Sequence, residues 1–211
     1  MYKKDIITFK IMLLGDSGVG KASIINRYIN NVFNDNISST IGINFSYKEI
    51  FVNKKDKIGL KLIDTVGQEK YRALTKSYFR LADAVLFVFS MNDKDTFDTI
   101  NDWMDSFKEN NSRKDILKYL VGNKNDLDVE VEQSLIDEFS KENKIPFISA
   151  SAKTKKNIDK LFEEIGKELY IYYFKKGIKE NKQNKQNKQY VFSIKTIKKP
   201  KNKCCLTNYD M

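Results

Sequence analysis

Residues 9–22 read Phe-Lys-Ile-Met-Leu-Leu-Gly-Asp-Ser-Gly-Val-Gly-Lys-Ala, an apolar run that leads directly into a glycine-rich turn. From Gly15 the turn follows the pattern G-x-x-x-x-G-K-[ST], in which backbone N–H groups and a helix N-terminus surround phosphate oxygens. Lys21 adds a positive charge for the outer phosphates. The last position departs from the pattern, because Ala22 stands where Ser or Thr supplies a hydroxyl to Mg²⁺. The stretch therefore predicts a strand, a phosphate cradle and a helix, with one metal ligand missing.

The rest of the chain continues this alternation of strands and helices. Apolar runs predict strands near 9–14, 45–52, 58–63, 84–89, 117–121 and 145–148. Apolar residues at helical spacing lie between them, as in Ile24, Ile25, Tyr28 and Val32 after the glycine turn. A second such series predicts a helix through Phe97, Ile100, Trp103, Met104 and Phe107. We expect an α/β fold of the P-loop NTPase type, a three-layer sandwich. Its six-stranded sheet is mostly parallel, with one antiparallel edge strand and about five flanking helices.

Charge divides the chain into two parts. The net charge is +10, and residues 175–211 hold 11 lysines against Glu180 and Asp210, which leaves +1 for residues 1–174. We expect a globular domain over 1–174 and a disordered, lysine-rich tail over 175–211. The positive charge of the tail has two interpretations. It is either compositional drift without a function, or it attracts the protein to an anionic membrane or to nucleic acid. There is no histidine, which excludes Ser-His and Cys-His catalysis.

Polar signatures follow three of the predicted strands, at the sheet edge where α/β proteins bind ligands. The first is the segment 64–68, in which Asp64 is suited to hold Mg²⁺ through water and Gln68 to orient an attacking water. The second is the segment 123–126, in which the Asp126 carboxylate can accept hydrogen bonds from both N–H donors on one edge of guanine. The third is the segment 151–153. An Asn-Lys-Asp turn alone could be accidental, but its combination with Ser-Ala-Lys after the next strand favours a guanine site. The Thr40 hydroxyl is a second candidate metal ligand.

Three further segments resemble the switch regions of small GTPases of the Ras superfamily, most closely the Rab family. They are Thr40–Phe45, Gly67–Arg72 and Ser77–Arg80, and the resemblance covers about residues 8–174. It implies that Phe33 stacks on guanine, and that Thr40 and Gly67 contact the third phosphate of GTP only. Loss of that phosphate then releases both loops. The resemblance also implies an exchange factor, a GTPase-activating protein and effectors that bind through Ile41–Phe45 and Gly67–Arg80.

The motifs and the resemblance together assign a set of site residues. Catalysis is assigned to Gln68, Lys21 and Gly67, and Mg²⁺ binding to Thr40 and Asp64. The cofactors are GTP or GDP with Mg²⁺. The residues expected to bind the nucleotide are Gly15, Asp16, Ser17, Gly18, Val19, Gly20, Lys21, Ala22, Ser23, Phe33, Thr40, Gly67, Asn123, Lys124, Asp126, Leu127, Ser151, Ala152 and Lys153.

Several positions depart from the family pattern. Ala22 cannot bind a metal, and one helical step turns Ser23 about 100° away, which predicts weaker Mg²⁺ affinity and faster nucleotide loss. The alternative is a tolerated change compensated by water. Val66 replaces the usual Ala beside a glycine that must move. Ile63 replaces a Trp that, in Rab proteins, joins the aromatics corresponding to Phe45 and Tyr78 in a partner-binding patch.

The tail carries the only two cysteines, Cys204 and Cys205, followed by six residues. Rab tails are prenylated on cysteines at or near the C-terminus, so the resemblance implies lipidation; unmodified thiols are the alternative. Two lipids, or one lipid with a basic segment, anchor a protein stably. We therefore expect a peripheral protein on the cytosolic face of intracellular membranes, with no signal peptide and no membrane-spanning segment.

Three functions are compatible with these features. The first is a switch in membrane traffic that hydrolyses GTP to GDP and phosphate, with unaided turnover on the order of 10⁻⁴ to 10⁻³ per second. The second is a degenerate binding module with impaired Mg²⁺ and nucleotide cycling, which Ala22, Val66 and Ile63 favour. Nucleic-acid binding through the tail is disfavoured, since the tail has few aromatics for stacking and the domain is nearly neutral.

Overall fold

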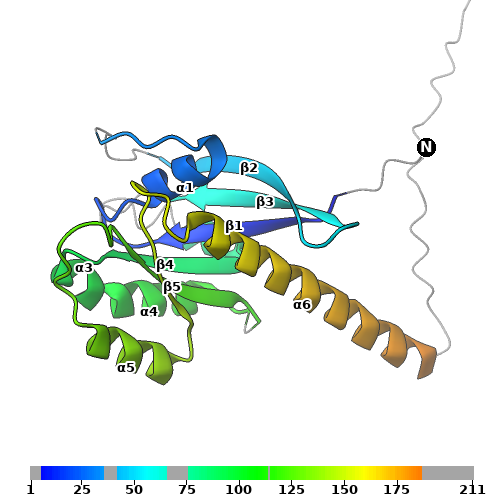
Figure 1. The fold of residues 1–211 in the computed structure, drawn as a ribbon. Coiled ribbons are helices and arrows are strands. Elements are labelled where there is room, and N and C mark those ends of the chain that lie inside the picture. Colours follow the sequence, from blue (N-terminus) through cyan, green and yellow to red (C-terminus); the bar gives the residue numbers. More distant parts are fainter. Residues whose placement is uncertain (1–5, 36–41, 66–75, 114, 187–211) are drawn as a thin grey trace, which may run out of the picture. The chain divides into compact units, whose positions relative to one another are not determined.

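The computed structural model describes residues 6–35, 42–65, 76–113 and 115–186 (Figure 1). Contacts divide the chain into two compact units, residues 1–174 and 175–211. The described strands are β1 (Thr8–Leu14), β2 (Asn44–Phe51), β3 (Lys57–Asp64), β4 (Ala84–Ser90), β5 (Leu117–Asn123) and β6 (Phe147–Ser149). The helices are α1 (Lys21–Asn30), the 3-10 turn η2 (Phe79–Leu81), α3 (Lys94–Asp98), α4 (Ile100–Asn110), α5 (Gln133–Asn143) and α6 (Ile158–Gln186).

The strands form one six-stranded sheet in the order β2-β3-β1-β4-β5-β6. All neighbours pair in parallel except β2 and β3, which form an antiparallel hairpin at one edge. This confirms the predicted fold class. The parallel strands bring their carboxyl ends to one edge of the sheet, so the loops that follow β1, β3, β5 and β6 meet there.

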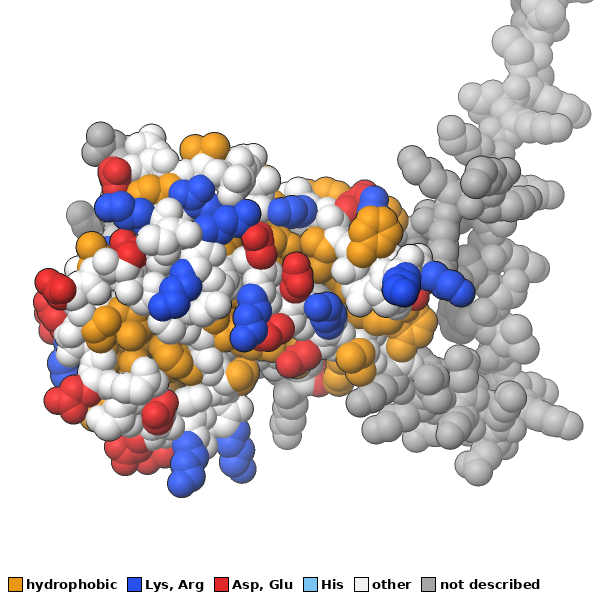
Figure 2. All heavy atoms as spheres, in the orientation of Figure 1, with side chains coloured by type: hydrophobic (Ala, Val, Ile, Leu, Met, Phe, Trp, Pro, Cys, Tyr) orange, Lys and Arg blue, Asp and Glu red, His pale blue; other side chains and the backbone are white. Residues whose placement is uncertain are grey.

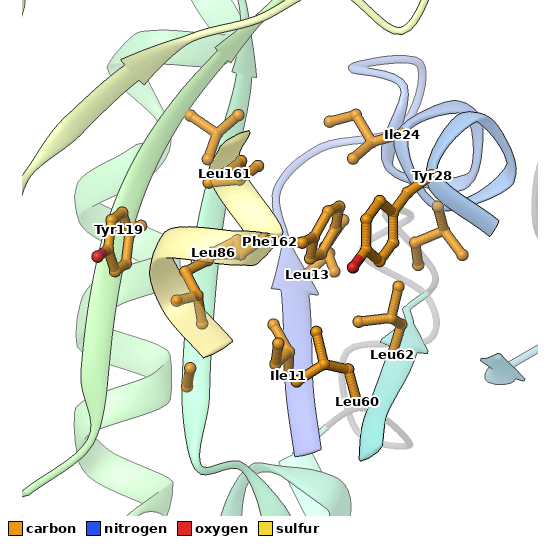
Figure 3. Close-up of a cluster of buried hydrophobic side chains, with 14 of the residues drawn as sticks. Ile11, Leu13, Ile24, Tyr28, Leu60, Leu62, Leu86, Tyr119, Leu161 and Phe162 are labelled. Atoms are coloured by element: carbon orange, nitrogen blue, oxygen red, sulfur yellow. The ribbon is translucent and has the colours of Figure 1, made fainter. Parts of the chain in front are cut away.

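Two apolar cores lie on the two faces of the sheet. Alternate residues of β1 supply both, with Ile11 and Leu13 on one face and Met12 and Leu14 on the other, since successive strand side chains point to opposite faces. The first core joins the sheet to α1 and α6, where the rings of Tyr28 and Phe162 stack at 4.1 Å (Figure 3). The second core joins the sheet to α3, α4 and α5.

Three local expectations are corrected. Helix α1 ends at Asn30 because Asn31 takes a left-handed conformation (φ 56°), so Val32 lies beyond the helix and is exposed. The apolar run from Phe97 to Phe107 is broken at Thr99 into α3 and α4. Helix α6 continues to Gln186, so residues 175–186 are helical and not disordered. Lys, Gln and Glu are good helix formers, and a helix already begun extends readily through them.

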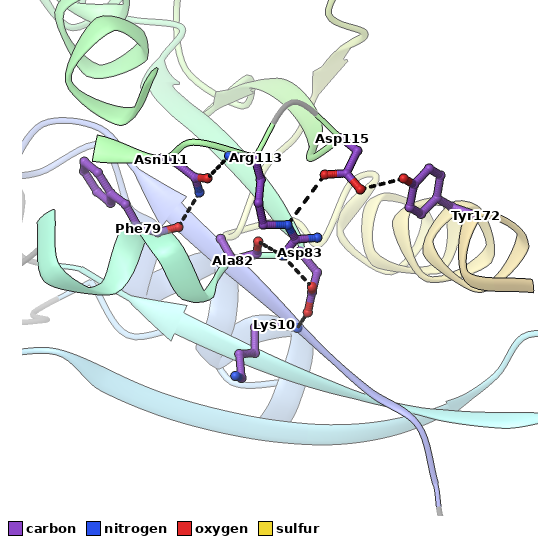
Figure 4. A network of polar contacts seen from close by, with 8 residues as sticks. All are labelled: Lys10, Phe79, Ala82, Asp83, Asn111, Arg113, Asp115 and Tyr172. Atoms are coloured by element: carbon purple, nitrogen blue, oxygen red, sulfur yellow. Dashed lines mark hydrogen bonds and ion pairs between the residues drawn. The ribbon is translucent and has the colours of Figure 1, made fainter. Parts of the chain in front are cut away.

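The ends of the strands away from the glycine turn are tied together by a polar network (Figure 4). The Arg113 guanidinium donates to Asp83 Oδ1 at 3.1 Å and lies 3.6 Å from Asp115 Oδ1. Asp83 Oδ2 accepts the backbone N–H of Lys10 at 2.9 Å, and the Tyr172 hydroxyl donates to Asp115 at 2.6 Å. The network therefore links β1, the entries to β4 and β5, and α6.

Candidate functional site

A cavity of about 400 Å³ opens at the carboxyl ends of the parallel strands. It lies where the sequence predicts the nucleotide site, and it gathers side chains from α1 and from the loops after β1, β3, β5 and β6. Its lining residues are Ser17, Gly18, Gly20, Lys21, Ala22, Ser23, Phe33, Asn34, Asp35, Asp64, Thr65, Asn123, Lys124, Asp126, Leu127, Ala152 and Lys153. Four of the residues expected to bind the nucleotide are not in this lining and instead support residues that are: Gly15, Asp16, Val19 and Ser151.

The glycine turn has a backbone that side chains would prevent. Gly20 has φ +94°, and a Cβ there would lie 2.3 Å from the Asn123 side-chain amide. Gly15 has φ +146°, and its Cβ would lie 2.0 Å from the carbonyl oxygen of Val88. Both positions require glycine, because positive φ strains other residues and there is no room for a side chain. The turn then leads into α1, whose N-terminal N–H groups face the cavity.

Lys21 is the buried cation of this site. Its Nζ donates to the backbone carbonyls of Gly15 at 2.8 Å and Asp16 at 2.7 Å. Burial lowers the pKa of Lys21 to about 8, although the nearby carboxylates of Asp64 and Asp16 act in the opposite direction. The ammonium is therefore held over the turn, where it can bind phosphate oxygens, and its charge is sensitive to mildly alkaline pH.

The side chain of Asp16 points away from the cavity. Its carboxylate accepts hydrogen bonds from the Thr99 hydroxyl at 2.7 Å and from the indole N–H of Trp103 at 2.8 Å. Trp103 is buried in the second core, on α4. Asp16 therefore anchors the phosphate loop to α4, a contact that sequence spacing alone does not indicate because it joins residues far apart in the chain.

The other end of the cavity holds the predicted guanine-reading residues. Asn123 is buried, and its side chain links two loops by donating to Val19 O at 2.9 Å and accepting from the Ala152 N–H at 3.1 Å. The Ser151 hydroxyl donates to Asp126 Oδ1, which fixes that carboxylate at the cavity wall. Asn123 thus has a structural role, and Asp126 is the group placed to accept from a base.

Arg27 supports this region and was not among the predicted site residues. From α1 it donates to the carbonyls of Ala152 at 2.7 Å and Lys153 at 3.0 Å, and its guanidinium lies 5.9 Å from the centre of the Phe33 ring. It therefore holds α1, the loop after β6 and Phe33 together. Asn34 and Asp35 also line the cavity, and no motif marks them; Thr65 lines it too and lies within the predicted segment 64–68, but no role is assigned to it from the sequence.

One corner of the cavity fits a divalent cation bound with a nucleotide. The Asp64 carboxylate is buried and lines the cavity together with Ala22 and Ser23. Mg²⁺ is commonly held by one or two carboxylates together with substrate phosphates, so Asp64 suits it. Ala22 also lines the cavity, and its side chain offers no oxygen ligand. No cluster of three or more metal-binding side chains occurs within the described ranges.

Several predicted residues lie outside the described residues. These are Thr40, Ile41, Val66, Gly67, Gln68 and the segment as far as Thr75, together with Cys204 and Cys205. Of the predicted partner-binding patch, Phe45 is 46% exposed and its ring lies 5.9 Å from that of Tyr78. Ile63, on the second strand of the sheet, is fully buried in the second core. The Lys61 ammonium lies 4.4 Å from the Phe45 ring instead.

A phosphate loop after β1, an acidic residue after β3 and a base-reading loop after β5, all opening into one cavity, define a P-loop nucleotide-binding protein. Comparison with known proteins narrows the class. The model of the Ras family matches residues 10–171. Ras-related protein Rab-13 of Bos taurus is 37% identical over 94% of this chain and 96% of its own length.

Two other relatives agree. Ras-related protein Rab-18-B of Danio rerio is 37% identical over 76% of this chain and 78% of its own length. Ras-related protein RABC1 of Arabidopsis thaliana is 39% identical over 74% of each chain. The chain belongs to the Ras family, and within it to the Rab small GTPases, which bind GTP and GDP with Mg²⁺ and hydrolyse GTP.

Proposed function

We propose that this protein is a guanine-nucleotide switch in vesicle and membrane traffic. We further propose that it binds the nucleotide but has a weakened affinity for the accompanying Mg²⁺. The observation that carries the proposal is the single cavity that joins Lys21 and Asp64 at one end to Asp126 at the other. An ammonium and a carboxylate separated in this way match the phosphates and the base of one nucleotide. Guanine supplies two N–H donors to Asp126, whereas adenine leaves that carboxylate unmatched.

Each described residue then has a role in nucleotide binding. The backbone of the glycine turn and Lys21 bind the phosphates, and Phe33, held by Arg27, covers the base. Asp64 holds Mg²⁺, which supplies charge neutralisation at the transferred phosphate. We assign orientation of the attacking water to Gln68, with Thr40 and Gly67 sensing the third phosphate. Turnover is slow without a GTPase-activating protein, because catalysis in this class depends on positioning and charge.

We infer the weaker binding of Mg²⁺ from Ala22, which lines the same cavity as Asp64 and carries no oxygen ligand. Restoring the hydroxyl with Ala22→Ser tests it. We expect GDP dissociation in the presence of Mg²⁺ to slow by about tenfold, on the order of one hydrogen bond to a charged group. With EDTA the two proteins should dissociate at the same rate. Fluorescent GDP release measures both, and Ser23→Ala serves as the matched control, with no expected change.

The second candidate is a degenerate module that keeps the fold and recruits partners without cycling. Ala22 and the burial of Ile63, which leaves the partner surface with Phe45 and Tyr78 only, favour it. Binding and hydrolysis assays distinguish the two. If the natural protein binds neither GTP nor GDP at micromolar concentration, the switch is excluded and the module remains. If Ala22→Ser changes nothing while nucleotide binds, the metal argument is wrong.

We further propose that Cys204 and Cys205 carry lipid, and that exchange factors, GTPase-activating proteins and effectors bind through Ile41–Phe45 and Gly67–Arg80. Lipids behind a tail with 11 lysines support attachment to anionic cytosolic membrane surfaces. No described helix is long and apolar enough to cross a membrane. Mass spectrometry of the C-terminal peptide from membrane-bound protein tests the lipid, and unmodified cysteines there would refute it.

A further inference from the structure

The end of the 1–174 unit opposite the nucleotide cavity exposes an unusual concentration of aromatic side chains. Four consecutive residues in the middle of α6, Ile171, Tyr172, Tyr173 and Phe174, are between 37% and 49% exposed. Successive helical residues point about 100° apart, so these four surround the helix instead of forming one stripe. Several large apolar side chains exposed close together mark a candidate binding surface.

The helix is held rigidly enough to present these side chains. The Tyr173 ring meets the buried Phe9 ring at 6.1 Å, and the Tyr172 hydroxyl donates to Asp115 in the polar network. One turn earlier, the Tyr170 hydroxyl donates to Asp56 in the β2–β3 turn at 2.7 Å. The aromatic segment is therefore attached to the sheet at three places, and the β2–β3 turn lies beside it.

The β2–β3 hairpin adds a further aromatic residue and basic side chains to this end. Phe51 is 64% exposed, and the ammonium of Lys57 lies 5.1 Å from its ring while also pairing with Glu49. Lys54 and Lys55 are exposed in the turn itself. Figure 2 shows hydrophobic and basic side chains close together around the β2–β3 hairpin.

We propose that this end of the domain, made of Phe51, Lys54, Lys55 and residues 171–174, docks directly on an anionic membrane surface. We call it the basic-aromatic end. Tyr and other aromatic side chains concentrate at the membrane–water interface. The ring of Tyr is apolar and contacts lipid, whereas its hydroxyl is polar and contacts water. Lysines beside them gain from anionic headgroups. The chain also continues from Phe174 directly into Lys175 and Lys176, the first of the 11 tail lysines.

The position of the basic-aromatic end fits this role. It lies at the start of β1 and β3, and the nucleotide cavity lies at their other ends, about 20 Å away along a seven-residue strand. Phe45 and Tyr78 also lie toward the cavity end, since Phe45 pairs with Ile63 at the end of β3. Docking therefore leaves the cavity and the partner surface facing away from the membrane. The inference rests on the proposed membrane attachment and adds a domain contact to it.

The test uses the full-length chain without lipid and vesicles of phosphatidylcholine with or without phosphatidylserine. The variant Ile171→Ser/Phe174→Ser removes two exposed side chains, and Val129→Ser/Leu135→Ser is the matched control for lost exposed apolar surface elsewhere. We expect the first variant to lose about tenfold or more in affinity for the phosphatidylserine vesicles, and the control to keep the natural affinity. Both should bind GDP as the natural chain does.

A fluorescence measurement tests insertion directly. The chain contains one Trp, Trp103, which is buried, so a Phe174→Trp variant adds a single exposed indole. We expect lipids brominated on their acyl chains to quench the added fluorescence. Equal vesicle affinity of all variants, or an unquenched indole, would overturn this contact while leaving lysine-driven attachment intact. If the natural chain does not bind the vesicles at all, the proposed attraction of the basic tail to anionic membranes is also wrong. A dimer that the double substitution dissociates, without vesicle dependence, would assign this end to a second copy and also overturn the proposal.

Discussion

A single buried lysine sets the pH range over which this site holds phosphate. Burial lowers the pKa of Lys21 to about 8, so the side chain is an ammonium below that pH and a neutral amine above it. Bound phosphate favours the ammonium and raises the pKa, so the free protein must take up a proton to bind nucleotide at alkaline pH. We therefore expect GDP affinity to fall as pH rises through 8, by up to about tenfold per unit. Calorimetric titration between about pH 7 and 9 measures this.

The control for this prediction is Lys21→Met. It should bind GDP weakly at all pH values and lose the decline between these limits, because the ammonium that titrates there has been removed. If the GDP affinity of the natural protein does not change between about pH 7 and 9, Lys21 stays an ammonium over that range. Burial then does not set the charge of Lys21.

At the scale of elements, helix α4 holds the phosphate loop in place, although α4 carries none of the sequence motifs. Trp103 of α4 donates its indole N–H to Asp16, and replacing it with Phe leaves that carboxylate with the Thr99 hydroxyl only. We expect Trp103→Phe to lower the free energy of unfolding by about 1–3 kcal/mol. Chemical denaturation followed by circular dichroism measures it.

A double-mutant cycle separates this hydrogen bond from the packing of the ring. Asp16→Ala and Trp103→Phe should couple by about 1 kcal/mol or more, since each removes the same contact. As a control, Asp16→Ala and Phe107→Leu should be additive, because Phe107 lies on the same helix but packs against Phe79 and Phe87. Additivity in both cycles would mean that the indole–carboxylate contact contributes nothing to stability.

The sequence predicts the elements well because their signals are local. Each described strand carries a run of apolar residues or, as in β2, an alternation of apolar and polar ones. The phosphate loop, Asp64, Asp126 and residues 151–153 are found by spacing after those strands. Sequence spacing does not predict the tertiary contacts that support the site. Arg27 and Trp103 act through contacts with distant residues, and the burial of Ile63 depends on the side chains of the second core that pack against β3. The extension of α6 to Gln186 was missed because a low-complexity composition indicates disorder, although its residues favour helix.

At the scale of the whole molecule, the 1–174 unit holds every buried apolar side chain among the residues whose burial the structure describes, so we expect the remainder not to be needed for folding. Buried apolar side chains run from Phe9 to Leu169, and the final ring contacts of α6 end at Phe174. We expect a chain that ends after Phe174 to melt within about 2 °C of the full-length protein, since it loses less than about 1 kcal/mol. Calorimetry with saturating GDP measures this.

The control for this truncation is a chain that ends after Lys167. It removes Leu169, which is buried in the first core, and Tyr170, whose hydroxyl holds the β2–β3 turn. Loss of a buried leucine costs about 2–5 kcal/mol, so this chain should melt several degrees lower or fail to fold. The chain ending after Phe174 should also keep its GDP affinity, because every described cavity residue precedes it. If it melts as low as the shorter control, residues 175–211 stabilise the domain, and the lysine-rich segment is more than a membrane tether.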